Sequence, residues 1–526
     1  MIGLHASIVG CVFAAAVTRI AVGDSVASLQ MPHAILPSDS SAYDAAGWSV
    51  ALETDIHVLG VRGKDNGGVN RGAVYIHRRQ GGGWIQSQKL TPNNPVDREE
   101  FGYSIAASGN LIVVGAPQSD RDANDGGSAW IFVSNSVSYL EAARIASPTA
   151  SLNGRFGSDV EVSDGAIRTL AVGAAGESTQ GVAAGQVHLF EEVQGAWVHR
   201  QSLQGNAVPT AQDEFGLSLA LSGEALAVGS PGEDIPGGAS NVGAVRVFRR
   251  SIEGLWNLEA VIASPMPSES GEFGRAVSLS GEVLAVGAYR EDAGAESSGR
   301  VHIFRRQKGA WVHESSLQCP QVGVGAEFGA SVALDRDALV VGATRLDTGD
   351  GTTGAAFLFR RSLTFDWQCY GRLTSQNPQA AEFAGTAVAL RNLDVAMSAP
   401  LRSVGAPYQG AAYIASLGAD CNGDLTPDLL ELAAGAADCN ANAVPDACDI
   451  AAGEPDDDGN GVPDVCEVVK CREDLSGNGS VNAADLALLL SLWATDGSKF
   501  NSDLNDDGFV GGADLALLLA AWGECP

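Results

Sequence analysis

The chain has 526 residues, of which 45% are hydrophobic and 18% are charged, so it can hold several domains and most of it should fold. Its formal net charge of −31 at pH 7 argues against nucleic acid and against an anionic membrane surface as partners. No apolar run after residue 23 approaches the ~20 residues of a membrane-spanning helix, so we expect no membrane span.

Residues 1–23 have the features of a secretory signal peptide. An apolar run at residues 8–17 is followed by a small-x-small motif at residues 21–23, which predicts cleavage before Asp24. The alternative is a buried first strand. Cleavage would remove Cys11 and leave eight cysteines, an even number that favours disulfides in an exported protein. We therefore predict a secreted or cell-surface protein.

A repeat fills residues 24–417, in seven copies spaced 55 to 59 residues apart. Each copy has a Phe-Gly pair, an apolar run that ends in small residues, a glycine followed by alternating residues, and in most copies a segment that opens on tryptophan. The elements are short, rich in Val, Ile, Leu and Phe, and bounded by turn residues, so they are strands. The pairs begin at Phe101, Phe156, Phe215, Phe273 and Phe328, with degenerate copies at Ala46-Gly47 and Phe383-Ala384. Four strands in each of seven copies predict an all-β, seven-bladed β-propeller.

The phase of the repeat predicts how the ring closes. The last copy ends at its third strand, residues 410–414, and no tryptophan segment follows it. Pro37 lies ten residues before Gly47, the same spacing that the next copy shows. We therefore expect residues 24–37 to supply the outer strand of the seventh blade.

The repeated sequence motifs resemble the FG-GAP repeats of integrin α-subunit propellers and their bacterial relatives. The order Phe-Gly, Val-Gly-Ala-Pro and Gly-x-Val-x-x-Phe carries the resemblance. Such repeats can hold a calcium loop between their first two strands. Here that turn is short, as at Ser108-Gly109 and Ser222-Gly223, and offers too few oxygens for Ca²⁺. We expect no metal in the blades.

By the same resemblance, long loops after the second strands form a ligand-binding face for a glycan or a protein. These loops are residues 118–127, 232–243, 290–299 and 345–354. Their acidic residues are Asp120, Asp122, Asp125, Glu233, Asp234, Glu291, Asp292, Asp347 and Asp350. Solvated loop charge is the more frequent explanation of such residues.

Propellers also host enzymes, so the fold alone does not decide whether this chain catalyses a reaction. Four of the eight histidines lie at equivalent blade positions, His188 with His302 and His199 with His313, which favours a structural role. Paired carboxylates of a glycoside hydrolase need not be adjacent in sequence. We assign no catalytic residue and no organic cofactor.

Residues 418–468 hold three acidic segments that start 18 residues apart, each with Pro-Asp at offsets seven and eight. Alternating carboxylate and amide oxygens can surround Ca²⁺. The predicted ligands are Asp420, Asn422, Asp424 and Asp428, then Asp438, Asn440, Asn442 and Asp446, then Asp456, Asp458, Asn460 and Asp464. The array resembles thrombospondin type 3 calcium repeats, and the alternative is a disordered acidic linker.

The cysteines favour an ordered tail. Cys421, Cys439, Cys448 and Cys466 allow three pairings, among which the sequence does not choose. Two further disulfides are predicted, Cys471–Cys525 around the C-terminal module and Cys319–Cys369 in the propeller.

Residues 469–526 hold the most specific motif, two 12-residue loops that start 29 residues apart and precede apolar segments. Positions one, three, five and twelve carry oxygen side chains, position six is glycine, and position seven offers its carbonyl. The predicted Ca²⁺ ligands are Asp474, Ser476, Asn478, Ser480 and Asp485 in the first loop, and Asp503, Asn505, Asp507, Phe509 and Asp514 in the second. Ser476 and Asn478 are the weaker ligands, so we expect the first site to be weaker.

Two such loop-helix units with Asp at position twelve resemble a type I dockerin. The resemblance implies a module that folds on binding Ca²⁺ and docks on a cohesin-like domain of another extracellular protein. In the family, positions ten and eleven help to choose the partner. Here they are Ala483-Ala484 and Gly512-Ala513, which leaves the cohesin class open.

Three functions fit these features. The first is a non-catalytic binding or scaffold protein, whose propeller recognises a ligand while the tail attaches it to an extracellular complex. The second is a dockerin-borne enzyme of polysaccharide degradation, and the third is a structural cell-surface assembly protein. We expect the first.

Overall fold

The computed structural model describes most of the propeller and much of the tail. The described residues are 28–31, 34–80, 83–163, 165–179, 182–205, 210–235, 238–318, 321, 323–349, 351–362, 366–416, 421, 427–433, 436–440, 444–456, 459, 461–466, 472–496 and 502–524. The predicted signal peptide and its cleavage site lie outside them.

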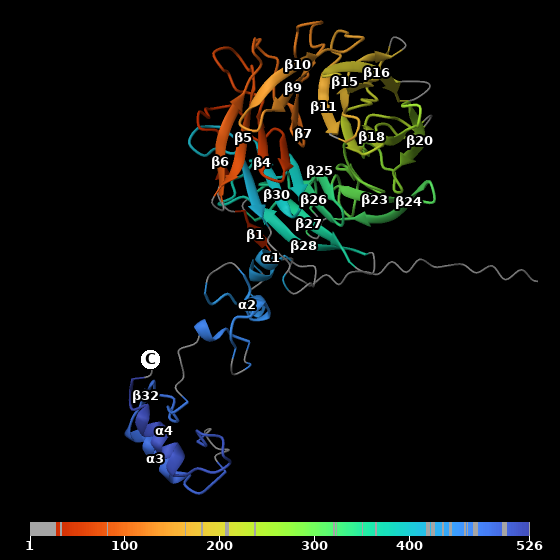
Figure 1. Ribbon diagram of the computed structural model, residues 1–526. Helices are drawn as coiled ribbons and strands as arrows, with labels where there is room; N and C mark the ends of the chain where they lie inside the picture. The colour runs from red at the N-terminus through yellow and green to blue at the C-terminus, as the bar shows by residue number, and fades with distance from the viewer. Residues whose placement is uncertain are drawn as a thin grey trace, which may run out of the picture.

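Seven antiparallel sheets form the ring in Figure 1, as the repeat predicts. Blade 1 is β3 (Val50–Glu53), β4 (Ile56–Val61), β5 (Ala73–Gln80) and β6 (Gly83–Leu90); blade 2 is β7 (Ser104–Ser108), β8 (Leu111–Ala116), β9 (Ser128–Ser134) and β10 (Tyr139–Ile145). Blade 3 is β11 (Phe156–Ser163), β12 (Thr169–Ala174), β15 (Gln186–Val193) and β16 (Ala196–Gln204), with a small hairpin of β13 (Ser178–Thr179) and β14 (Val182–Ala183). Blade 4 is β17 (Ser218–Ser222), β18 (Ala225–Ser230), β19 (Ala244–Arg250) and β20 (Trp256–Ala263); blade 5 is β21 (Ala276–Ser280), β22 (Val283–Ala288), β23 (Arg300–Gln307) and β24 (Ala310–Leu317). Blade 6 is β25 (Phe328–Asp335), β26 (Ala338–Ala343), β27 (Ala355–Arg361) and β28 (Trp367–Thr374); blade 7 is β29 (Val388–Arg391), β30 (Asp394–Ala399), β31 (Ala411–Ser416) and β2 (Ala34–Ile35).

The N-terminal segment closes the ring. Strand β2 pairs antiparallel with β31, Ala34 opposite Tyr413, and so becomes the outer strand of blade 7. This confirms the predicted closure. Only part of the segment serves it, because β1 (Ser28–Gln30) pairs parallel with β28 and adds a fifth strand to blade 6. The backbone groups of both outer edges thereby gain partners.

Deleting residues 24–37 should therefore lower the melting temperature of the propeller, since blades 6 and 7 each lose an outer strand. Thermal unfolding followed by circular dichroism measures this. An unchanged melting temperature would contradict the closure.

The predicted degenerate pair Phe383-Ala384 is wrong by one residue. Ala384, not Phe383, forms the parallel bridge to Gly354 that Phe328 forms to Gly299 in the preceding blade. Gly385 then takes the left-handed backbone (φ +87°) that glycine occupies in the Phe-Gly pairs. The glycine defines the register here, because its conformation is harder to replace than the phenylalanine side chain.

The phenylalanine of each pair is a core residue. The Phe101 side chain is fully buried and lies edge-on to Trp130, with 5.5 Å between the ring centroids and an 81° angle between the planes. Residues of blade 1, such as Val58 and Ile76, pack in the same cluster. Each such ring therefore joins two blades, and burying it contributes about 1.5–3 kcal/mol.

A serine on the inner strand and a glycine on the second strand fix how closely two blades approach. The Ser218 hydroxyl donates to the carbonyl oxygen of Gly274 in the next blade at 2.7 Å. A Cβ on Gly229 would lie 2.1 Å from that same carbonyl oxygen. The small residues of the Val-Gly-Ala run are thus required by contact between neighbouring blades.

We expect Ser218→Ala to cost about 1 kcal/mol, because a buried carbonyl loses its partner. Urea unfolding measures the loss. Blade 5 offers the matched control, since it carries Ala276 at the equivalent position, and Ala276→Ser should stabilise it. Equal stability of Ser218→Ala and the wild type would contradict this role.

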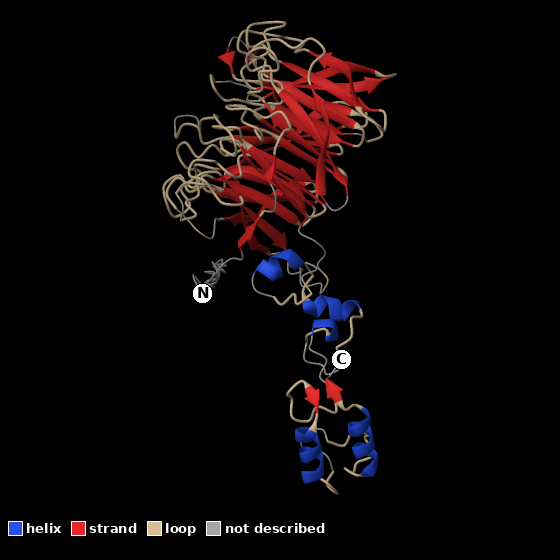
Figure 2. Ribbon diagram, turned by 90° about the vertical axis from the view of Figure 1, so that its left-hand side faces the viewer, coloured by secondary structure: helices blue, strands red, loops and turns tan. Residues whose placement is uncertain are grey.

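The tail is built from short helices, drawn below the sheets in Figure 2. They are α1 (Asp428–Ala433), α2 (Asp446–Ala452), the 3₁₀ turn η1 (Asp464–Cys466), α3 (Ala483–Ser491) and α4 (Gly512–Ala520), with strands β32 (Ser480–Val481) and β33 (Gly523–Glu524). Helix α1 contacts β1 of the propeller. Within the described parts of the chain, none of these helices has both the length and the apolar character needed to cross a bilayer.

Candidate calcium sites and ligand-binding face

The first tail loop is closed by its two terminal carboxylates. Asp474, at position one, accepts hydrogen bonds from the backbone N–H groups of Asn478 (3.1 Å) and Gly479 (2.6 Å). Asp485, at position twelve, is fully buried at the start of α3. The donors to its carboxylate are the backbone N–H groups of Ser476 (2.7 Å) and Asn482 (2.7 Å).

The second loop repeats this arrangement. Asp503 accepts from the backbone N–H groups of Asp507 (3.2 Å) and Gly508 (2.7 Å). Asp514 is fully buried at the start of α4. Its donors are the backbone N–H groups of Leu504 (2.8 Å), Asn505 (3.2 Å) and Gly511 (2.6 Å). The two loops therefore have one conformation, as their matching sequences predict.

The oxygen donors in these loops fit Ca²⁺, which takes six to eight hard oxygen ligands. Gly479 and Gly508 hold the sharp turn at position six with φ of +85° and +83°. Burial raises the pKa of Asp485 and Asp514, but the backbone N–H donors outweigh it, so each pKa lies below its usual value. Both groups are therefore carboxylates at neutral pH. The predicted side chains, with the carbonyls at position seven, could hold one ion in each loop.

The module around the loops is symmetric. Its core is Leu475, Val481, Leu489, Leu504, Val510 and Leu518, three residues from each half. Strands β32 and β33 pair and join the two ends of the module. On the surface, Leu490 and Leu519 are 50% and 51% exposed, and Trp493 and Trp522 are 43% and 49% exposed. Each half thus presents the same partly uncovered apolar residues at the C-terminal end of its helix, and exposed positions ten and eleven at the helix start.

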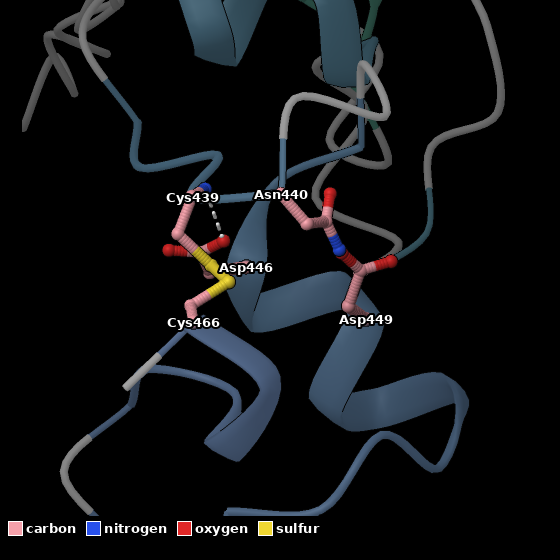
Figure 3. The surroundings of a disulfide bond; sticks show 5 residues. All are labelled: Cys439, Asn440, Asp446, Asp449 and Cys466. Atoms are coloured by element: carbon pink, nitrogen blue, oxygen red, sulfur yellow. Dashed lines mark hydrogen bonds between the residues drawn. A yellow bond between two sulfur atoms is a disulfide. The ribbon is translucent and has the colours of Figure 1, made fainter. Parts of the chain in front are cut away.

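In the linker the structure chooses one cysteine pairing, Cys421–Cys448 and Cys439–Cys466. Each bond joins the start of one acidic segment to the helix of the next. The predicted ligands Asp428 and Asp446 lie beside these bonds, and Figure 3 shows the second of them. Asp446 accepts from the Cys439 backbone N–H at 2.8 Å, and Asp428 accepts from that of Cys421 at 3.0 Å. Each carboxylate thus closes its own segment.

The other predicted ligands of the linker that the structure describes also lie near hydrogen-bond partners or at the start of a helix. Asp456 accepts from the backbone N–H of Gly461, five residues on, at 3.1 Å. That is the closure that Asp474 and Asp503 make in the tail loops. The Asn440 amide donates to Asp449 at 3.0 Å, Asp438 is partly exposed, and Asp464 begins η1. The predicted ligands Asp420, Asn422, Asp424, Asn442, Asp458 and Asn460 lie outside the described residues, as do Cys319, Cys471 and Cys525 of the two further disulfides.

On the propeller, the acidic loop residues mostly hold their own loops together. Three of them accept a backbone N–H from the far side of the loop: Asp120 from Asp125 (2.7 Å), Asp234 from Asn241 (2.8 Å) and Asp292 from Ser297 (2.8 Å). Three others pair with an arginine or accept from a serine: Asp122 pairs with Arg144 (2.5 Å), Glu233 pairs with Arg246 (2.6 Å), and Glu291 accepts from the Ser264 hydroxyl (3.0 Å). Asp347 accepts from the Gly349 backbone at 2.9 Å, and Asp350 lies outside the described residues.

The paired histidines form the same network twice. His188 contacts Glu177 at 2.5 Å and Ser202 at 2.8 Å, and His199 contacts Ser202 at 3.0 Å. His302, Glu291, Ser316 and His313 repeat these contacts in blade 5. The central histidines, His188 and His302, are fully buried, whereas His199 and His313 are exposed, so each network runs from the blade interior to its surface.

A cavity of about 280 Å³ lies where the inner strands meet. Trp48, Tyr103, Asp159, Leu217 and Arg275 are among its lining residues. Sequence reasoning missed Asp159, although the equivalent inner-strand positions in other blades carry Ser or Ala. Its carboxylate accepts from the backbone N–H groups of Leu219 (2.7 Å) and Val160 (2.9 Å).

Burial raises the pKa of Asp159 to about 7. Glu161 lies two residues further along β11, and its pKa is raised by burial and by the charge of Asp159. A comparison of the seven inner strands would have revealed this acidic pair, which occurs in blade 3.

Comparison with known families matches both parts of the chain. The FG-GAP repeat model matches residues 33–77, 84–132, 256–304 and 311–359, and the type I dockerin model matches residues 472–521. Each FG-GAP match begins at an outer strand and continues through three strands of the next blade, so the sequence repeat crosses the blade boundary. A search of curated proteins finds no match to the chain.

The chain therefore carries FG-GAP repeats in a seven-bladed β-propeller and a C-terminal type I dockerin domain. Type I dockerins typically bind calcium, and a dockerin implies docking on a cohesin in a cellulosome-like complex. The thrombospondin type 3 resemblance of residues 418–468 remains a prediction.

Proposed function

We propose that this protein is a secreted, non-catalytic adaptor of an extracellular complex. The dockerin attaches it to a cohesin, and the propeller recognises a ligand on its loop face. The two closed loops with matching carboxylate geometry carry the first half of the proposal. The symmetric apolar residues at the ends of α3 and α4 support a protein partner, because large apolar side chains left about half exposed at matching positions are typical of an interaction surface.

We assign Ca²⁺ to the two loops through the predicted residues. Asp503→Ala should remove the second site and abolish most calcium-dependent ordering of the module, because position one supplies a charged ligand and closes the loop. Asp474→Ala should have a smaller effect if the first site is the weaker. Calorimetric titration of the full chain with CaCl₂, together with circular dichroism, measures both.

Asp506→Ala is the matched control, because Asp506 occupies position four and pairs with Arg472 outside the predicted ligand set. It should bind calcium like the wild type. Full calcium affinity in the Asp474→Ala, Asp503→Ala double variant would exclude these loops as the sites.

A second function, hydrolysis of a polysaccharide, is favoured by one observation. Asp159 borders the central cavity with a pKa of about 7, the range in which a carboxyl group can act as a general acid. Release of reducing sugar that Asp159→Asn abolishes would support an enzyme. Binding without release would support the adaptor.

A further inference from the structure

The junction between blade 7 and blade 1, here called the closing seam, carries an exposed aromatic pair. Tyr43 and Tyr408 come from opposite sides of the seam, and their ring centroids lie 5.7 Å apart with planes tilted by 42°. Tyr43 is 66% exposed and Tyr408 47% exposed. Val404, in the same loop as Tyr408, is 47% exposed.

Both tyrosines occupy backbone positions that other seams fill with different residues. In each of several seams, a residue three before the Phe-Gly pair donates its N–H to a carbonyl of the preceding blade. At the closing seam Tyr43 donates to Pro407 at 2.9 Å, and two residues on Ala45 donates to Tyr408 at 3.2 Å. The corresponding bonds elsewhere are Arg98 to Val69, Asn153 to Asn124 and Ser270 to Ser240.

The repeated geometry requires a left-handed backbone at these positions. Tyr43 has φ of +66° and Tyr408 has φ of +49°. The equivalents of Tyr408 with positive φ are Asn70, Asp125, Asn241 and Ser297. Asn and Asp tolerate this conformation, whereas a bulky aromatic residue is disfavoured there. The tyrosines therefore reduce stability and gain little burial, which is the pattern of residues kept for a ligand.

The two short segments that carry the pair have no charged side chain. Residues 40–43 and 403–408 contain only Ser, Ala, Gly, Val, Pro and Tyr. The full blade 7 loop, residues 401–410, has one charged residue, Arg402, which is buried, whereas the equivalent loops of other blades, such as residues 118–127 and 290–299, carry several acids and an arginine. The flanking carboxylates are paired: Asp44 is buried beside Lys64 at 2.9 Å, and the partly exposed Asp39 pairs with Lys89 at 2.6 Å. On a chain of net charge −31, an uncharged aromatic surface fits a neutral ligand.

We propose that Tyr43 and Tyr408 form the propeller's ligand platform, and that it binds a neutral polysaccharide by stacking on its sugar rings. Aromatic faces with nearby hydroxyl groups offer apolar contact and hydrogen bonding together, which a pyranose ring requires. The proposal rests on the recognition role given to the propeller, and it names the site and the ligand class.

Affinity electrophoresis of the full chain in gels that contain xylan, β-glucan or mannan tests this, with polygalacturonate as the anionic comparison. We expect at least one neutral polymer to retard the wild type. The Tyr43→Asn, Tyr408→Asn double variant should bind that polymer roughly tenfold more weakly or worse. No retardation by any neutral polymer, retardation by polygalacturonate alone, or undiminished binding of the variant would each overturn the proposal.

The stability of the variants separates binding from folding. Tyr408→Asn installs the residue that Asn241 supplies in another seam, so its melting temperature should equal or exceed that of the wild type. A lower melting temperature would show that the pair is structural. Ile252→Asn, at a fully exposed isoleucine of blade 4, is the matched control and should retain polysaccharide binding. Calcium titration of the same variants checks the dockerin separately, so a failed platform does not imply failed docking.

Discussion

Replacing Arg402 with alanine should destabilise the propeller by about 3–5 kcal/mol, because it leaves Glu382 buried without its cation. Glu382 is fully buried, and Arg402 bonds both to it and to the carbonyl oxygen of Gln376 at 2.7 Å. Burial raises the pKa of Glu382, and removing the guanidinium would raise it further. The loss in free energy of unfolding, relative to the wild type, should therefore grow as pH rises from 5 to 8. Guanidinium unfolding at several pH values measures it.

Blade 6 supplies the control for this substitution. At the two equivalent positions it carries Leu346 and Ala326, both buried in an apolar cluster. The Arg402→Leu, Glu382→Ala double variant copies that pair and should recover most of the lost stability, since no charge remains unpaired. A cost below 1 kcal/mol for Arg402→Ala alone would contradict the assigned role of the pair.

Acidification should destabilise blade 1 before the other blades. His57 and His77 face each other across β4 and β5, with Nδ1 atoms 3.4 Å apart, and both Nε2 atoms are buried without a hydrogen-bond partner. Burial lowers the pKa of His77 from 6.5 to about 4, and burial and His77 lower that of His57 well below 6.5. The unfolded chain then binds more protons than the native one below pH 6.5. Stability is full above that pH and falls as pH drops toward 4, by about 3 kcal/mol for His77 alone.

The other blades show what removes this sensitivity. Leu226 and Phe248 form the same cross-strand pair in blade 4, and Leu284 and Phe304 form it in blade 5. The His57→Leu, His77→Phe double variant should therefore be more stable than the wild type, with a difference that widens from pH 7 to pH 4. Parallel stability curves for the two proteins over that range would rule out the histidine pair as the cause.

The spacing of the repeated motifs predicts the ring of blades, because every blade packs the same residue types at the same positions. The seven sheets, the closing strand and the tryptophan-led outer strands all follow from it. Phe383 lies one residue out of register, because the backbone conformation of the glycine, and not the aromatic side chain, fixes the register. Strand β1 had no signal of its own, because a three-residue parallel pairing depends on where the chain passes blade 6.

The features of the candidate sites also fall into two groups, those that are predictable from the local sequence and those that are not. The dockerin loops were predictable because consecutive residues supply their ligands. The linker cystines and Asp159 were not, because each depends on residues distant in sequence: Cys421 meets Cys448, and the Asp159 carboxylate reaches Leu219 in the next blade. Most of the described acidic residues on the propeller loops close their loops or pair with a neighbouring side chain, which local sequence alone does not distinguish from ligand binding.

We propose that the tail docks this propeller onto a cohesin through calcium. A pull-down of the secreted full chain, with Ca²⁺ and with a chelator, followed by identification of the captured protein, tests it most directly. Calcium-dependent docking predicts capture of a cohesin-bearing protein with Ca²⁺, loss of capture with chelator, and loss in the Asp474→Ala, Asp503→Ala double variant. Capture that persists in the chelator, or a captured protein without a cohesin domain, would contradict it.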